Sequence, residues 1–199
     1  MPEFARPVLE TLRQPVETGE VVIARAAAHV RYPCRFLLVA AANPCRCGHA
    51  NDPAMACPRA PGCASDYMGR ISGPLMDRFD LRVEVPAVRW EDLDGRATGE
   101  PSAVVAKRVA AARTVQAERL GEGRVNADMT AAELDEHAAP DAEASALLRR
   151  FAEARGLSAR GYTRIRRVAR TVADLAGEAS VGPAHVAEAL AFRIPAVAD

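Results

Sequence analysis

The stretch FLLVAAANPCRC, residues 36–47, carries the signal that decides the fold. Its first part, residues 36–41, is apolar on both faces, and such a run suits a central strand of a sheet that is covered on both sides. Asn43 follows this run, at the carboxyl end of the strand, where open α/β sheets bind their ligands. The stretch therefore predicts an α/β fold with Asn43 at a binding edge. The alternative for Asn43 is an ordinary turn residue before Pro44.

The flanking sequence supplies further elements of this α/β part. Apolar residues at helical spacing predict one helix over residues 6–17. Two short extended stretches, 20–25 and 29–32, lie on either side of an alanine-rich tip and predict a hairpin. Residues 43–67 are rich in Cys, Pro and Gly without periodicity, which indicates a loop. A second strand of the sheet is expected at residues 81–85, where apolar and polar residues alternate.

From residue 102 onward the sequence indicates helices separated by short polar breaks. The clearest helix begins after an N-cap at Ser158 and stops at Gly177. Its apolar stripe is formed by Ile165, Val168, Ala169, Val172 and Leu175. The inner faces of two earlier helices are predicted at Val105, Val109 and Ala112, and at Leu147, Leu148 and Phe151. Pro183 starts a last helix that runs through Leu190.

Strands followed by a helical bundle predict an α/β layer with a helical lid. We place the boundary near Gly99, which gives an α/β part at residues 1–99 and a helical part at residues 100–199. The formal net charge is zero, so no overall field draws the chain to nucleic acid or to a membrane surface. The apolar runs fall well short of the roughly 20 residues that cross a bilayer, and the start of the chain has no signal-peptide pattern. We therefore expect a cytoplasmic protein without a membrane partner.

The cysteines of the predicted loop have the spacing C-x-C-x9-C-x5-C, formed by Cys45, Cys47, Cys57 and Cys63. Four thiolates can enclose a tetrahedral structural Zn²⁺ and hold together a loop too polar to fold alone. His49 is a substitute ligand. The alternative is a loop without metal that carries free thiols. Cys34, just before the apolar run, is expected to be a core residue.

No phosphate-binding loop is present in the sequence. Such a loop needs glycines that expose backbone N–H groups and a lysine that reaches the β and γ phosphates. Lys107 is the only lysine, and it lies in VVAKRVAA with no glycine before it. We therefore expect the chain alone to hydrolyse ATP poorly or not at all.

Three separated stretches together resemble the Mg-chelatase-like AAA+ ATPases of the YifB and ComM type: LVAAANPCRC at 38–47, RISGPLMDRFDL at 70–81 and LSARGYTRIRRVARTVADLAG at 157–177. The opening residues 1–25 are similar to the stretch that follows the acidic Walker B pair of the family. The resemblance implies a partial AAA+ core, with a parallel-sheet remnant, hairpin and Cys-rich loop, followed by a lid. It also implies a ring motor, namely a hexamer that uses ATP with Mg²⁺. The members of the family include helicases that act on branched DNA during natural transformation.

The resemblance also implies roles for individual residues. Asn43 matches sensor 1, which would hold the attacking water near the γ-phosphate. Arg78 matches the arginine finger, which would act on the nucleotide of a neighbouring subunit, and Arg70 would join the same edge. The alternative for Arg78 is a salt bridge with Asp77 or Asp80.

Arg160 matches sensor 2 at the start of the lid helix. Arg160, Arg164 and Arg167 share one helix face, and a nucleotide or DNA phosphate would be their ligand. The alternative is a solvated basic face. The expected hairpin resembles one that lies in the ring pore, so Arg25, His29 and Arg31 are candidate DNA contacts.

The implied partners are further copies of the chain in a homo-hexamer, or a complementing N-terminal half that carries the phosphate loop, together with DNA. Two other classes of function stay open at this point. One is a non-enzymatic module that binds zinc and nucleic acid, and the other is a non-functional truncated remnant.

Overall fold

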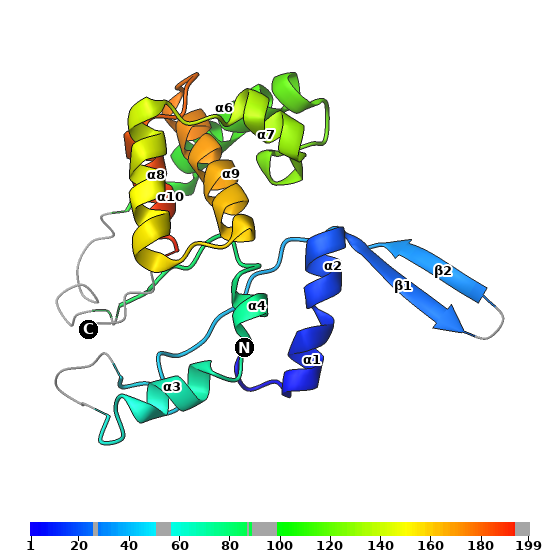
Figure 1. Cartoon of the computed structure of the whole chain (residues 1–199), viewed down its shortest axis with the longest axis vertical. Coiled ribbons are helices and arrows are strands. Elements are labelled where there is room, and N and C mark those ends of the chain that lie inside the picture. The colour runs from blue at the N-terminus through cyan, green and yellow to red at the C-terminus, as the bar shows by residue number, and fades with distance from the viewer. Residues whose placement is uncertain (26–27, 51–56, 87, 89–98, 194–199) are drawn as a thin grey trace. The chain divides into compact units, whose positions relative to one another are not determined.

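The computed structural model describes the chain except for residues 26–27, 51–56, 87, 89–98 and 194–199. The described residues are mainly helical and contain one two-stranded antiparallel sheet (Figure 1). They divide into two compact units, Met1–Phe79 and Asp80–Asp199. Among the described helices, none is both long enough and apolar enough to cross a membrane.

The first unit opens with two short helices, α1 (Arg6–Thr11) and α2 (Arg13–Thr18), where the sequence predicts one helix over residues 6–17. The break has a local cause, because Pro15 has no N–H to donate to the carbonyl of Thr11. Gly19, in the left-handed conformation with φ 67°, ends α2.

Further along the first unit lie α3 (Gly62–Met68) and the one-turn helix α4 (Gly73–Met76). Leu9 of α1, Ile71 and Leu75 of α4 form its small buried core. α1 is thereby joined to α4 across more than sixty residues of sequence.

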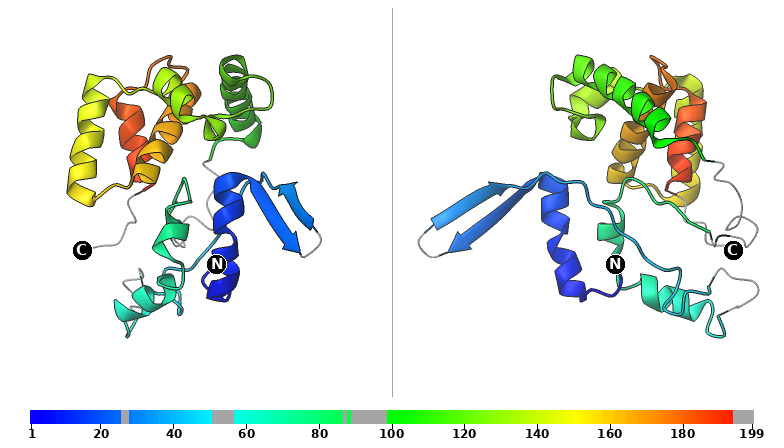
Figure 2. Two further views of the ribbon diagram at one scale, coloured as in Figure 1. Left: turned by 45° about the vertical axis from the view of Figure 1, so that its right-hand side comes forward. Right: turned by 180° about the vertical axis from the view of Figure 1, so that it is seen from behind.

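The predicted hairpin is present as β1 (Glu20–Arg25) and β2 (Ala28–Pro33). β1 follows α2 directly, and both views show the two strands extending from the end of that helix (Figure 2). Because facing residues of an antiparallel pair share a side of the sheet, the register sorts the side chains into two faces. One face is mostly apolar and carries Val21, Ile23, Val30, Tyr32 and also Arg25. The other carries Glu20, Val22, His29 and Arg31.

The strands predicted at residues 36–41 and 81–85 are not formed among the described residues, and neither is the parallel sheet they implied. Leu37 is 88% exposed and Val39 is 81% exposed. A strand exists only where a neighbouring strand accepts and donates its backbone hydrogen bonds. The described residues place no such neighbour beside either run, so both remain apolar chain segments without sheet pairing.

The second unit is a bundle whose longest members are α6 (Ser102–Leu120), α8 (Ala142–Arg155) and α9 (Ala159–Ala176). The single-turn η1 (Asn126–Asp128), the helix α7 (Ala131–His137) and α10 (Pro183–Ala191) complete it. The main core lies where α8, α9 and α10 meet, and a smaller core links α6 to α7.

The predicted caps of α9 are confirmed. The Ser158 side chain accepts a hydrogen bond from the Gly161 backbone N–H at 3.0 Å, and Gly177 ends the helix with φ 75°. The predicted apolar stripe of α9 is buried at Ile165 and Ala169, but the prediction is wrong at Leu175, which is exposed.

The predicted inner face of α6 is correct only in the C-terminal half of the helix. Ala112, Gln116 and Leu120 are buried, whereas Val109 is 43% exposed. The first turns of α6 therefore lie outside the core, and only the C-terminal half of the helix packs against it.

Asp174 of α9 is the centre of a buried polar network in the second unit. Arg119 donates two hydrogen bonds to its carboxylate, at 2.6 and 3.0 Å, and Arg170 donates one at 3.0 Å. The amide of Asn126 donates another at 2.7 Å. Burial alone would raise the pKa of Asp174, but the bonds from Arg119 and Asn126 hold it below its ordinary value.

Changing Asp174 to asparagine should lower the free energy of unfolding by about 3–5 kcal/mol, because the guanidinium groups of Arg119 and Arg170 lose the negative charge that they share. Urea denaturation followed by far-UV circular dichroism measures this change. The matched control is Asp135→Asn, since the Asp135 side chain is 74% exposed although it also pairs with a buried arginine. That control should cost no more than about 1 kcal/mol. Equal losses in the two variants would contradict the structural role given to the network.

Candidate functional site

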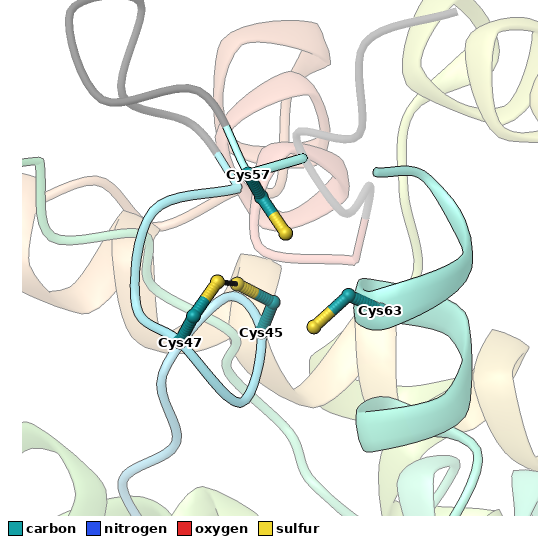
Figure 3. Close-up of side chains that lie close together, drawn as sticks. All are labelled: Cys45, Cys47, Cys57 and Cys63. Atoms are coloured by element: carbon teal, nitrogen blue, oxygen red, sulfur yellow. Dashed lines mark hydrogen bonds between the residues drawn. The ribbon is translucent and has the colours of Figure 1, made fainter. Parts of the chain in front are cut away.

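The structure brings together the four cysteines that the sequence spacing singles out (Figure 3). Cys45 and Cys47 lie on a tight turn, and Gly48 closes it by donating its N–H to the Cys45 carbonyl at 3.1 Å. Cys63 is the second residue of α3, and Cys57 precedes that helix. The four sulfur atoms all lie within 4.8 Å of one another. In a tetrahedral site with Zn–S bonds of about 2.3 Å, the sulfurs are about 3.8 Å apart, so this group fits a single zinc ion.

The thiols of this cysteine cluster perturb one another. The Sγ atoms of Cys45 and Cys47 are 3.0 Å apart. A hydrogen bond from the Cys47 thiol lowers the pKa of Cys45 to about 6, and the same interaction raises the pKa of Cys47 to about 12. At neutral pH the thiolate of Cys45 is thus favoured, whereas deprotonation of Cys47 beside it is disfavoured. A bound divalent cation would stabilise both thiolates. His49, the substitute ligand, is not part of this group. Cys34 is only half-buried, so its expected place in the core is wrong.

Arg78 is buried within the first unit, with its side chain only 7% exposed. Its Nε donates to the carbonyl of Arg13 at 3.1 Å and one terminal nitrogen donates to the carbonyl of Pro74 at 2.6 Å. The other terminal nitrogen forms an ion pair with Glu17. The acidic partner is therefore Glu17, and not Asp77 or Asp80 as the sequence-based alternative has it. No local pattern points to a residue on α2, 61 positions away.

The other candidates of the first unit are more open. Asn43 is exposed and lies two residues before Cys45. Arg70 is exposed and donates to the Pro2 carbonyl at 3.4 Å. On the hairpin, Arg25 lies on the mostly apolar face, whereas His29 and Arg31 lie together on the other. The structure therefore divides the three predicted DNA contacts between two faces.

The arginines of α9 divide into two groups. Arg160 lies exposed in the first turn of α9. Arg164 pairs with Asp80, and Arg167 donates to the backbone carbonyl of Met129. Burial, and then the nearby charge of Arg164, lowers the pKa of Arg167. The predicted phosphate-binding face is therefore largely occupied by contacts within the second unit.

Two further arginines of α9 donate to backbone carbonyls, one on α7 and one in the loop that follows α9. Arg166 donates to the carbonyls of Leu134 and Ala138 at 2.6 and 3.2 Å, at the end of α7. Arg170 donates to the carbonyl of Ala179 at 2.7 Å. The basic character of this helix thus serves mainly the packing of the bundle.

The amino-acid sequence matches two protein-family models, one over each half of the chain. Residues 1–93 match the family of magnesium chelatase subunit ChlI, and residues 99–193 match the C-terminal domain of the same subunit. The chain belongs to the Mg-chelatase family.

Its similar relatives are bacterial proteins. The chain is 41% identical over 194 residues to competence protein ComM of Haemophilus influenzae, a match that covers 97% of this chain and 37% of the relative. It is 36% identical to YifB of Salmonella typhimurium, over 97% of this chain and 38% of that protein. Rv2897c of Mycobacterium tuberculosis is 41% identical over 96% of this chain and 38% of its own length. The chain thus spans somewhat more than a third of the length of these relatives.

Proposed function

We propose that the chain is the C-terminal portion of an ATP-driven AAA+ ring motor that acts on DNA, with Asn43 as sensor 1, Arg78 as arginine finger and Arg160 as sensor 2. The observation that carries the proposal is the match of both halves, in order, to the two successive parts of one chelatase motor subunit. The name of the Haemophilus relative, a competence protein, supports action on DNA during transformation.

Hydrolysis then requires a phosphate loop from outside this chain. Lys107 lies inside the regular helix α6, where backbone N–H groups are used within the helix and cannot cradle a phosphate. The apolar runs at 36–41 and 81–85 are suited to pair with strands that carry the phosphate loop and the acidic pair. Mixing this chain with the remaining part of the family protein and measuring ATP turnover tests the proposal.

The position of Arg160 supports its role as sensor 2. It lies in the first turn of α9, an 18-residue helix. The N-terminus of a helix carries partial positive charge, which disfavours a cation there unless an anion binds beside it. A bound phosphate would be attracted both to the guanidinium and to the dipole. In a hexamer with Mg²⁺-ATP between subunits, Arg160 would contact a bound nucleotide and Arg78 would act on the nucleotide of a neighbouring subunit.

For DNA, we propose that the polar face of the hairpin makes the contact. Arg31→Ala should weaken binding of a branched DNA and reduce the slope of log K against log salt by about 1, because one phosphate contact is lost. Arg25→Ala removes the same charge from the opposite face and should leave the slope nearly unchanged. Fluorescence anisotropy at several salt concentrations measures both. A larger loss of slope for Arg25→Ala would place the DNA on the other face.

A structural zinc centre in the first unit is the second proposed function, and the cysteine cluster carries it. The ion would be held by Cys45, Cys47, Cys57 and Cys63. Its role there would be structural, because it would link the turn after Asn43 to α3. With four thiolates the site is closed, which is typical of structural rather than catalytic zinc.

The rival functions make different predictions. A non-enzymatic zinc and nucleic-acid module would bind DNA with strong salt dependence, and adding the rest of the family protein would bring no ATP turnover. A non-functional remnant would show no cooperative unfolding transition, whereas the buried core of the second unit favours one.

A further inference from the structure

Arg78 is held by its own chain, although its proposed task is to reach a phosphate bound to another copy. Its guanidinium donates to the backbone carbonyls of Arg13 and Pro74 and forms an ion pair with the Glu17 carboxylate. With its side chain 7% exposed, the guanidinium is withdrawn from any ligand offered at the surface.

Glu17 is the partner that a ligand can replace. The two carbonyls are fixed by α2 and α4, whereas the Glu17 carboxylate is on a flexible side chain that is 34% exposed. It also supplies the charge-assisted bond, which is about twice as strong as a neutral one. A phosphate offers the guanidinium the same fork-shaped geometry as a carboxylate and carries more negative charge.

We propose that Glu17 is a positioning residue that keeps Arg78 withdrawn until a nucleotide phosphate presented by a second copy of the chain takes its place. This inference rests on the proposed role of Arg78 as a finger in trans. The exchange never leaves the buried guanidinium without an anion, which is the costly state. The released carboxylate is solvated because its side chain already reaches the surface.

The withdrawn state can be tested on the purified chain without nucleotide. An arginine-selective dicarbonyl, phenylglyoxal, should modify Arg78 at least about tenfold more slowly than Arg31, whose side chain is 76% exposed. Glu17→Gln should speed modification of Arg78 roughly fivefold or more, and Glu17→Asp should give an intermediate rate. Peptide mass spectrometry follows each arginine separately. The matched control is Glu10→Gln, which removes the ion pair to Arg13 in the same unit and should leave the Arg78 rate unchanged.

Equal modification of Arg78 and Arg31 in the unchanged chain would overturn the withdrawn state. So would a Glu17→Gln rate no faster than that of the Glu10→Gln control, while circular dichroism shows both variants folded. In the assembled motor, Glu17→Gln should raise ATP turnover at subsaturating ATP roughly fivefold, and no change would overturn the displacement step. The finger role is tested separately by Arg78→Ala, so its failure is distinguishable from failure of the Glu17 exchange.

Discussion

Replacing Arg78 with alanine should lower ATP turnover of the assembled motor by about 10³- to 10⁵-fold, the range by which a trans-acting arginine finger accelerates hydrolysis. The finger stabilises charge that develops on the transferred phosphoryl group, so turnover should fall while ATP binding changes little. Arg78→Lys should also be impaired, because a single ammonium cannot replace the planar fork. Steady-state hydrolysis and ATP affinity are measured on the same preparations.

The control for Arg78 has to separate catalysis from folding, because its contacts to Arg13, Glu17 and Pro74 also join α2 to α4. Rings that mix Arg78→Ala subunits with subunits carrying a disabled phosphate loop should regain part of the turnover. In such rings an intact finger faces an intact nucleotide at some interfaces. If turnover falls only in proportion to the folded fraction and mixing restores nothing, Arg78 is a structural clamp and not a finger.

Removing zinc should strongly destabilise the folded state of the first unit, since structural zinc sites contribute about 10–16 kcal/mol of apparent binding free energy near pH 7. We expect one zinc ion per chain after loading, and none in Cys45→Ser or Cys57→Ser. A chelator should unfold the turn and α3, because the described residues of this segment contribute little beyond Tyr67, Cys45 and Cys57 to the interior. Elemental analysis gives the metal content and circular dichroism the loss of structure.

The control for the zinc site is Cys34→Ser, because Cys34 lies outside the cluster and should retain the full metal content. Zinc affinity should fall as pH falls, since binding displaces thiol protons, among them that of Cys47 with its pKa raised to about 12. A chain that remains free of metal after loading, or equal metal loss in Cys34→Ser and Cys45→Ser, would contradict the site.

Local features of the fold were predictable from the sequence. The caps of α9 depend on residues a few positions apart, Ser158 and Gly177, and the hairpin depends on two neighbouring stretches. The cysteine cluster was predictable for a related reason, because closely spaced thiols within one loop need only that loop to bring them together.

Features set by distant partners were not predictable. The apolar run at 36–41 has the composition of a buried strand, but a strand needs a neighbour and the described residues supply none. Arg164 and Arg167 are expected from the sequence to bind a phosphate, yet Arg164 pairs with Asp80 and Arg167 donates to the backbone carbonyl of Met129. The partner of Arg78, Glu17, is distant in sequence and lies on a separate helix, so no spacing rule reveals it.

We propose that this chain supplies sensor and finger residues to a nucleotide site whose phosphate loop lies outside it. ATP turnover by the chain alone, and by the chain mixed with the remaining part of the family protein, tests it most directly. We predict no turnover above background for the chain alone, and turnover in the mixture that Arg78→Ala abolishes. Robust turnover by the chain alone would contradict the claim.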